Sequence, residues 1–329
     1  MKPISFRVLW SVLVLGLVLV VVKMFFNNRA RHAKKSTVVL WMAPDTATIP
    51  HTPAGEMIRY GRDLIAHTAV YLGPKGKVAT ISNGMNCQNC HLEAGTKRWG
   101  NNYGGTASTY PKFRERSGAV ESVEKRVNDC LIRSLNGQPL DSNSRELRAI
   151  VAYIQWLGKD VPKDYKPPGS GIKEIAYLER SADTAKGRAV YVYKCSKCHG
   201  ENGAGKQSVG DVTYEYPPLW GDNAYNIGAG LYRLSRFAGY VKNNMPFGVD
   251  YNKTQLTDEE AWDVAAFVNS RPRPCKGFPE DWPVVTTKPV DYPFGPFSDT
   301  FSEQQHKYGP FGPITRHKEQ WHIKFYHFK

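Results

Sequence analysis

Two short cysteine motifs carry the clearest chemistry in this 329-residue chain. Each has the pattern C-x-x-C-H, in which two thiols form thioethers to the vinyl groups of a haem and the histidine becomes an axial iron ligand. A redox dithiol or a zinc half-site is the alternative for either motif alone. Two motifs, each following an expected helix, predict two covalently bound haem c groups. Their residues are Cys87, Cys90, His91, Cys195, Cys198 and His199.

The second axial ligands decide what each iron can do. In the second half, Met245 is followed by Pro246 on a loop after the haem motif, which is typical of a thioether ligand. Ligation by His199 and Met245 would raise the reduction potential. The alternative is a loop methionine that packs against the haem edge.

The first half has no methionine or histidine between His91 and its closing helix. Cys130 is the soft ligand available there, and a thiolate favours Fe(III) and lowers the potential. Such a ligand suits a site that handles sulfur or catalyses an inner-sphere reaction. The alternative is a disulfide between Cys130 and Cys275, the two cysteines outside the haem motifs.

Arginines surround this candidate cysteine. If residues 121–135 are helical, Arg126, Cys130, Arg133 and Ser134 share one face. Guanidinium groups beside the iron would bind an oxyanion through two parallel hydrogen bonds. The alternatives are pairing with haem propionates and a solvated helix face. As a cluster around Cys130, these residues favour anion binding.

The elements that must position these residues repeat. Apolar periodicity predicts helices over residues 54–72 and 185–194, each before a haem motif. Closing helices are expected near Asn143, capped by Asn143 and Glu146, and near Thr257, capped by Thr257 and Glu260. Each half is thus a helix, a haem motif, a long loop and a closing helix.

The expected fold is mainly α, with two class I cytochrome c domains in tandem, long ordered loops and one N-terminal transmembrane helix before them. The tail is expected to wrap the domains as an ordered extension, because it is rich in aromatic residues. The predicted parts are an anchor or signal segment at 1–30, a linker at 31–52, the first cytochrome domain at 53–165, a linker at 166–182, the second cytochrome domain at 183–275 and the extension at 276–329.

The N-terminus carries an apolar run from Val8 to Phe26. As a helix this run would rise roughly 28 Å, close to the thickness of a bilayer core. We see no convincing cleavage site before Arg29, so an uncleaved anchor is favoured over a cleaved signal peptide. The predicted location is the periplasmic side of the bacterial inner membrane.

The chain has a formal net charge of +14. Nucleic acid is a poor explanation in an exported cytochrome, so no nucleic-acid partner is expected. The charge suits an anionic substrate, an acidic redox partner or a membrane surface.

The chain also resembles the thiosulfate dehydrogenase family of dihaem cytochromes. The run Tyr-Pro-x-x-Arg-x-Arg-Ser-Gly from Tyr110 and the run Arg-x-Asn-x-Cys-x-x-Arg-Ser-x-Asn-Gly from Arg126 carry the resemblance, together with the tail near Phe301. It implies His91 and Cys130 as ligands of the first haem. It further implies substrate contacts from Arg116, Arg126 and Ser134. Some members have lysine immediately before the ligand methionine, where this chain has Asn244.

The expected function is therefore that of a dihaem oxidoreductase. It would oxidise two thiosulfate ions to tetrathionate, or run the reverse, and pass electrons from the His/Cys haem to the His/Met haem. A redox protein, such as another cytochrome c or a terminal oxidase, would be its partner. The alternative is a membrane-anchored electron carrier without its own substrate. A dihaem peroxidase is a third class, but no oxygen-handling residues are evident.

Overall fold

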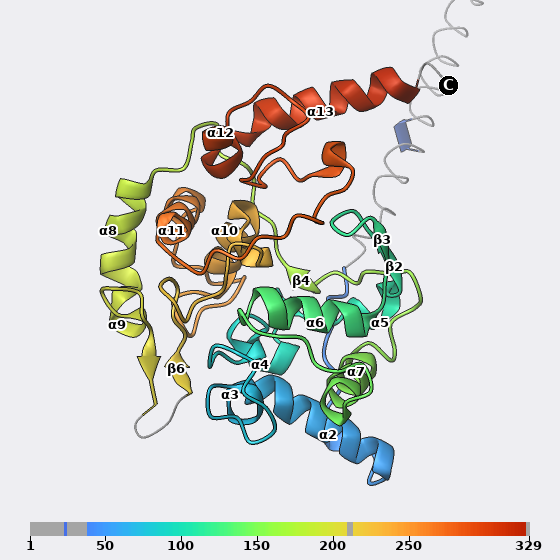
Figure 1. Cartoon of the computed structure of the whole chain (residues 1–329). Helices are drawn as coiled ribbons and strands as arrows, with labels where there is room; N and C mark the ends of the chain where they lie inside the picture. The colour runs from blue at the N-terminus through green and yellow to red at the C-terminus, as the bar shows by residue number, and fades with distance from the viewer. Residues whose placement is uncertain (1–22, 25–37, 209–212, 327–329) are drawn as a thin grey trace, which may run out of the picture. The chain divides into compact units, whose positions relative to one another are not determined.

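Helices provide most of the regular structure in residues 23–24, 38–208 and 213–326, which are the part of the chain that the computed structural model describes (Figure 1). The elements before the connector are η1 (Thr46–Thr48), α2 (Pro53–Ala66), α3 (Thr68–Leu72), η2 (Cys87–Asn89), α4 (Leu92–Gly95), β1 (Gly100–Asn102), α5 (Thr106–Thr109), β2 (Lys112–Arg114), β3 (Ala119–Glu121), α6 (Val123–Arg133) and α7 (Arg145–Leu157). Those that follow are β4 (Gly171–Ile172), α8 (Thr184–Lys194), α9 (Ser196–His199), β5 (Lys206–Gln207), β6 (Tyr214–Tyr216), η3 (Gly230–Tyr232), α10 (Leu234–Asn244), α11 (Asp258–Ser270), η4 (Val285–Thr287), α12 (Glu303–Tyr308) and α13 (Phe311–Tyr326). The strands form three two-stranded antiparallel pairs, β1–β4, β2–β3 and β5–β6.

The same helix pair occurs in both halves. In the first half α2 packs on α7, and in the second α8 packs on α11. Each contact depends on a glycine: an added methyl group would lie 1.9 Å from the Ala149 carbonyl oxygen at Gly61, and 1.9 Å from the Asp263 carbonyl oxygen at Gly187. Only glycine permits so close an approach of two backbones. One apolar core lies around the first pair and another around the second.

The helix ends agree with the sequence in part. Thr257 and Glu260 form the expected capping box of α11. The cap of α7 is Ser144 and not Asn143, because the Ser144 hydroxyl accepts the Leu147 N–H (3.2 Å). The helix expected over 54–72 divides into α2 and α3 at His67, whose backbone leaves the helical region (φ −126°, ψ 39°).

The segment between the halves, expected as a linker, is an ordered part of the fold. Its β4 pairs with β1, and the Pro168 carbonyl accepts the Trp41 N–H (2.6 Å). The Ala176 carbonyl accepts the indole N–H of Trp262 in the second core (2.9 Å). These contacts fix the connector to both halves.

The C-terminal extension is also ordered, and it contains α12 and α13, which sequence periodicity did not predict. Phe311 and Ile314 are buried in the second core. His306 lies between the Val290 carbonyl oxygen (2.9 Å) and the Asp299 carboxylate (2.9 Å) and stacks on Phe297. This end of the extension, around α12 and α13, therefore packs on the second half.

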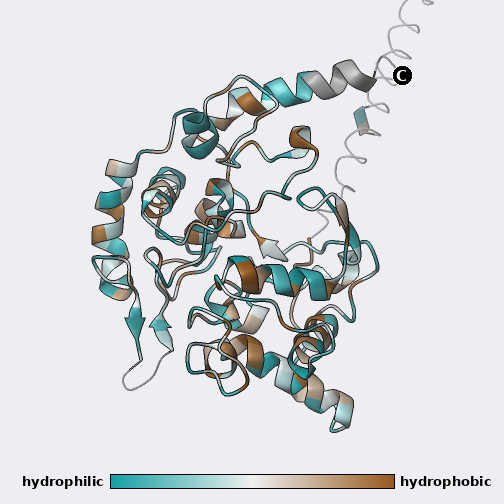
Figure 2. Ribbon diagram, viewed as in Figure 1, coloured by the Kyte–Doolittle hydropathy of each residue, from teal (hydrophilic) through white to brown (hydrophobic). Residues whose placement is uncertain are grey.

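The predicted membrane anchor needs correction. A spanning helix requires about 20 consecutive apolar residues. Within the described residues no helix combines that length with that apolar character. The 16-residue α13 includes Arg316 and Lys318, and Figure 2 shows polar and apolar residues mixed along the helices. We therefore correct the transmembrane part of the fold class and the membrane-anchored location, because the described residues do not support an anchor. Apart from Lys23 and Met24, the apolar run lies outside the described residues.

Candidate functional site

The first haem motif is fixed to the junction of α2 and α3 by buried polar side chains. The Cys87 N–H donates to the Thr68 hydroxyl (2.9 Å), and the Asn86 side chain accepts the Ala69 N–H (2.8 Å). The Gln88 amide donates to the Ala66 carbonyl (2.7 Å). Thr68 is completely buried, so the loop that carries the two cysteines has a defined place on the helices.

The His91 imidazole is held by one of its two nitrogens. Nδ1 lies 2.5 Å from the Asn101 carbonyl oxygen, and the Tyr103 ring stacks on the imidazole with centroids 4.5 Å apart. Burial lowers the pKa of His91 to about 4, so the ring is neutral at ordinary pH. A neutral ring whose Nδ1–H is bonded to a carbonyl presents Nε2 to a metal.

A cavity of about 260 Å³ adjoins this motif. Cys87, Cys90, His91 and Cys130 all line it, together with apolar side chains such as Ile150 and Ile154. Two thiols, an imidazole and a further soft ligand on an apolar cavity match what a covalently attached haem requires. The residues present fit the group.

Cys130 lies in the last turn of α6, which begins after Ser122, whose hydroxyl accepts the Lys125 N–H (3.3 Å). The thiols of Cys130 and Cys275 are both free, and Cys275 is exposed. The disulfide that the sequence left open is therefore not formed. Cys130 lies within a helix, whereas Met245 directly follows α10, so the two positions are only approximately equivalent in the repeat.

The second motif repeats the arrangement of the first. His199 Nδ1 lies 2.9 Å from the Pro217 carbonyl oxygen, and burial lowers the pKa of His199 below its ordinary value. A cavity of about 560 Å³ is lined by Cys195, Cys198, His199 and Met245. This donor set also fits a haem. Cys90 of the first motif lines this cavity too, so the two haem cavities share a wall.

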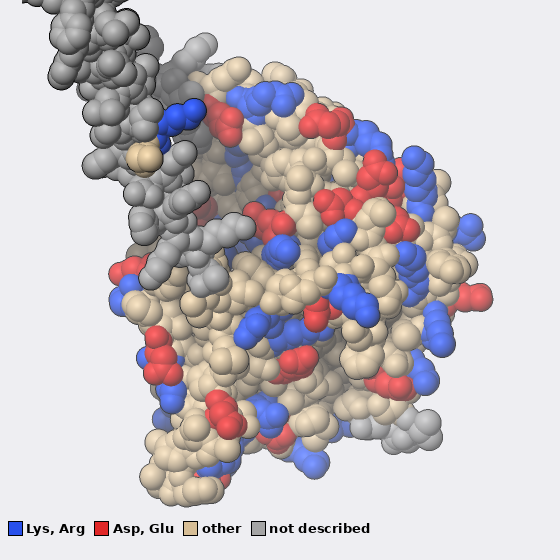
Figure 3. Space-filling view, turned by 180° about the vertical axis from the view of Figure 1, so that it is seen from behind, with Lys and Arg blue, Asp and Glu red and all other residues tan. Residues whose placement is uncertain are grey.

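A third cavity, of about 240 Å³, which we call the anion pocket, adjoins the first haem cavity. The two share His91, Cys130, Arg126 and Ser134. The charged side chains that line it are all cationic, and none of its described lining residues is acidic. They are Arg114, Arg116, Arg126, Lys166, Arg233 and Arg236. On the face shown in Figure 3, by contrast, Lys and Arg are interspersed with Asp and Glu.

Arg116 and Arg126, which the sequence singled out, both lie in this pocket without a carboxylate in ion-pair distance among the described residues. Burial, together with the nearby Arg126 and Arg133, lowers the pKa of Arg116 to about 10. Its Nε is buried without a hydrogen-bond partner. The Cys130 sulfur raises the pKa of Arg126. Both side chains stay protonated at neutral pH, so an anion can pair with them.

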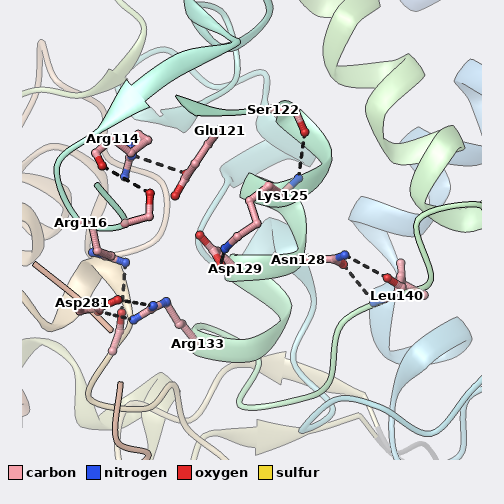
Figure 4. Close-up of polar contacts among 12 residues, drawn as sticks. Arg114, Arg116, Glu121, Ser122, Lys125, Asn128, Asp129, Arg133, Leu140 and Asp281 are labelled. Atoms are coloured by element: carbon pink, nitrogen blue, oxygen red, sulfur yellow. Dashed lines mark hydrogen bonds and ion pairs between the residues drawn. The ribbon is translucent and has the colours of Figure 1, made fainter. Parts of the chain in front are cut away.

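Arg133 does not line the anion pocket. Its guanidinium forms two 2.7 Å hydrogen bonds with the Asp281 carboxylate (Figure 4). It also lies over the Phe278 ring at 3.8 Å. Both partners come from the C-terminal extension. The four residues that were expected to share one helix face therefore have different surroundings. Arg126, Cys130 and Ser134 line the anion pocket, whereas Arg133 pairs with Asp281.

Sequence reasoning missed four cations of the pocket. Arg114 lies on β2, Lys166 on the connector, and Arg233 and Arg236 at the start of α10. The three-residue spacing of Arg233 and Arg236 places them one helical turn apart, which was a usable local signal. Nothing local connects them with Cys130, about a hundred residues earlier.

Comparison with known proteins gives the same two-part division. Residues 77–162 match the family model "SoxA/TsdA, cytochrome c domain", and residues 184–272 match the model "Cytochrome c". The chain is 38% identical to a thiosulfate dehydrogenase of Psychrobacter arcticus over 242 residues, covering 73% of this chain and 71% of the relative. It is 37% identical to that of Allochromatium vinosum, covering 74% and 88%.

A solved structure is also similar. It is the thiosulfate dehydrogenase TsdBA from Marichromatium purpuratum in its "as isolated" form, with a TM-score of 0.66 and 32% sequence identity. The match covers 71% of this chain and 50% of that one, so this chain spans about half the length of TsdBA.

Proposed function

Because this chain belongs to the thiosulfate dehydrogenase family of dihaem c-type cytochromes, we propose that it couples two thiosulfate ions to tetrathionate or catalyses the reverse reaction. Its two cytochrome c domains carry two covalently bound haem c groups. The observation that supports the substrate is the anion pocket, in which Arg116 and Arg126, without a carboxylate in ion-pair distance among the described residues, adjoin Cys130.

Each haem would be held by one motif and one further sulfur ligand. Cys87 and Cys90 would form thioethers to the first haem, and His91 and Cys130 would bind its iron. The second set is Cys195, Cys198, His199 and Met245. When bound, the haems supply two one-electron redox centres, of which thiolate ligation lowers the potential of the first and thioether ligation raises that of the second.

The reaction places unusual electrostatic demands on the site. Two thiosulfate dianions form one S–S bond to give one tetrathionate dianion, and two electrons are released. Two unit charges at roughly 4 Å near a protein surface repel by about 4 kcal/mol, and two dianions by about four times as much. Fixed cations beside the reacting sulfurs offset this repulsion. Arg116 and Arg126 would bind the sulfonate oxygens, and Ser134 would donate a hydrogen bond.

Electrons would leave through the second haem site to a redox partner, such as another cytochrome c or a terminal oxidase. The common wall at Cys90 gives the two sites a short connection. The second candidate function is an electron carrier without its own substrate. A carrier has no use for two arginines without ion-pair partners beside one haem, so Arg116 and Arg126 favour the enzyme.

The test is turnover of the purified dihaem protein with thiosulfate and ferricyanide. We expect one tetrathionate for every two electrons transferred, and loss of turnover in Cys130→Met with both haems still attached. Cys275→Ser, which changes the exposed thiol, is the matched control and should retain turnover. Unchanged thiosulfate oxidation in Cys130→Met, or none in the fully haem-loaded wild-type protein, would contradict the proposal.

A further inference from the structure

The second half of the chain contributes to the anion pocket beside the first haem site. Arg233 and Arg236, at the start of α10, line the same cavity as Arg116, Arg126 and Cys130. The pocket therefore has cations on two separate segments of the fold.

The two second-half arginines differ in how far their charge is already neutralised. Arg233 Nε and Nη2 lie 2.9 and 2.5 Å from one oxygen of Asp291, whose carboxylate is completely buried. The other oxygen accepts the Ser235 N–H (3.0 Å) and hydroxyl (2.5 Å). Arg233 is thus a fixed, paired group. Arg236 has a weaker partner, Glu174, at 2.8 Å, whose side chain is 71% exposed.

Lys166 on the connector also lines the anion pocket, and it lines the first haem cavity with Arg126 and Cys130 as well. It is exposed, and among the described residues no carboxylate lies within ion-pair distance of it. Water screens an exposed ion pair strongly, so Arg236 loses little free energy when it exchanges Glu174 for another anion. Of the two α10 arginines, Arg236 is therefore the one whose charge remains available.

We propose that Arg236 forms a second anion subsite, which binds the sulfonate group on the α10 side of the anion pocket. The inference rests on the proposed function, because tetrathionate carries a sulfonate at each end and two thiosulfates must be held together before their sulfurs join. Arg116 and Arg126 serve the other sulfonate. With cations on both sides, each of the two anions has its own counter-charge.

The opposing interpretation is that Arg236 pairs with a propionate of the first haem. That role would make the haem potential depend on Arg236, because removing a cation beside the haem changes the energy of its charge states. A subsite residue would instead affect the concentration of tetrathionate or thiosulfate needed for turnover. The two roles therefore differ in what a substitution changes.

Two substitutions of opposite electrostatic effect test the proposal. Arg236→Ala should raise the KM for tetrathionate and for thiosulfate by roughly 3- to 10-fold with little change in kcat. Glu174→Gln removes the competing carboxylate and should lower both KM values by about 1.5- to 5-fold. Arg188→Ala, an exposed arginine on α8 that does not line the pocket, is the matched control and should match the wild type. The midpoint potentials of both haems, measured by spectroelectrochemistry, should stay unchanged.

The proposal is overturned if Arg236→Ala behaves like Arg188→Ala, or if it shifts a haem potential while both KM values stay the same. KM changes of the same sign in Arg236→Ala and Glu174→Gln also oppose it. These outcomes all require a wild-type protein that turns over thiosulfate. If the haem-loaded wild-type protein does not turn over thiosulfate, the proposed function itself is contradicted. The failure of the subsite and the failure of the proposed function can therefore be told apart.

Discussion

At the scale of single residues, the proposed chemistry depends on how Arg126 is placed. It lies on α6 one turn before Cys130 and lines both the first haem cavity and the anion pocket. No carboxylate among the described residues is close enough to neutralise it. A buried guanidinium without a counter-ion is costly, and a bound oxyanion removes that cost.

We expect Arg126→Ala to lower kcat/KM for thiosulfate by about 10- to 150-fold, since a charge-assisted hydrogen bond contributes roughly 1.5–3 kcal/mol. Arg126→Lys keeps the charge but not the planar geometry, so its loss should be smaller. Lys125→Ala is the control on the same helix, because Lys125 pairs with Asp129 and does not line the pocket (Figure 4). Normal kinetics in both Arg126 variants, or loss of haem from them, would place the substrate elsewhere.

At the scale of elements, the C-terminal extension contacts two segments that surround the anion pocket. Its Asp281 binds Arg133, and the N–H of Trp282 donates to the Arg116 carbonyl (2.7 Å). The Arg116 guanidinium lies over the Trp282 ring at 5.9 Å. The extension thus holds both the strand loop that carries Arg116 and the end of α6.

Replacing Asp281 by Asn should therefore destabilise the fold. Both members of the Arg133–Asp281 pair are buried, with side chains 10% and 8% exposed. Removing one member of such a pair leaves an uncompensated charge, at a cost of about 3–5 kcal/mol. In the control Glu215→Gln, which breaks the exposed pair with Lys206, the change should stay within about 1 kcal/mol. Thermal unfolding of the haem-loaded variants measures both, and equal melting temperatures would refute the structural role of Asp281.

At the scale of the whole folded unit, the two halves meet through Asn226, which is completely buried. Its amide donates to the Ile132 carbonyl (2.9 Å) and the Asn136 side chain (3.0 Å), and its N–H donates to the Arg133 carbonyl (3.1 Å). These contacts connect the end of α6 with the segment that leads to α10. The pocket between Arg126 and Arg236 needs the two halves to be fixed in this way.

We expect Asn226→Ala to lower the free energy of unfolding by about 1–3 kcal/mol, because it leaves buried polar groups without partners. It should also raise the KM for thiosulfate, since the two sides of the pocket would no longer be held together. Asn143→Ala, at an exposed position before α7, is the control and should change neither quantity. If thermal unfolding and KM are the same in both variants, Asn226 does not couple the halves.

The sequence by itself determined the part of the chemistry that depends on residues close together along the chain. The haem motifs, the Met-Pro loop at Met245 and the cysteine at Cys130 are recognisable because covalent attachment and ligation require fixed residue types at fixed spacing. The paired helices of each half followed from apolar periodicity, which is a local property of the helix. The haem cofactors were predicted on these grounds and the family from its resemblance in the runs from Tyr110 and Arg126, and the comparisons confirm both. The membrane anchor, predicted from apolar length and the lack of a cleavage site, is the part that needed correction, because no described helix is long and apolar enough to span a membrane.

Only the tertiary structure decided which charges meet. Arg133 and Arg126 look alike in sequence, yet the extension neutralises one through Asp281 and leaves the other facing the anion pocket. Lys166 and Arg236 reach that pocket from the connector and from α10. Such convergence depends on how surfaces from distant segments pack together, and no local pattern encodes it. The composition of the anion pocket was therefore available only once the two halves were seen in contact.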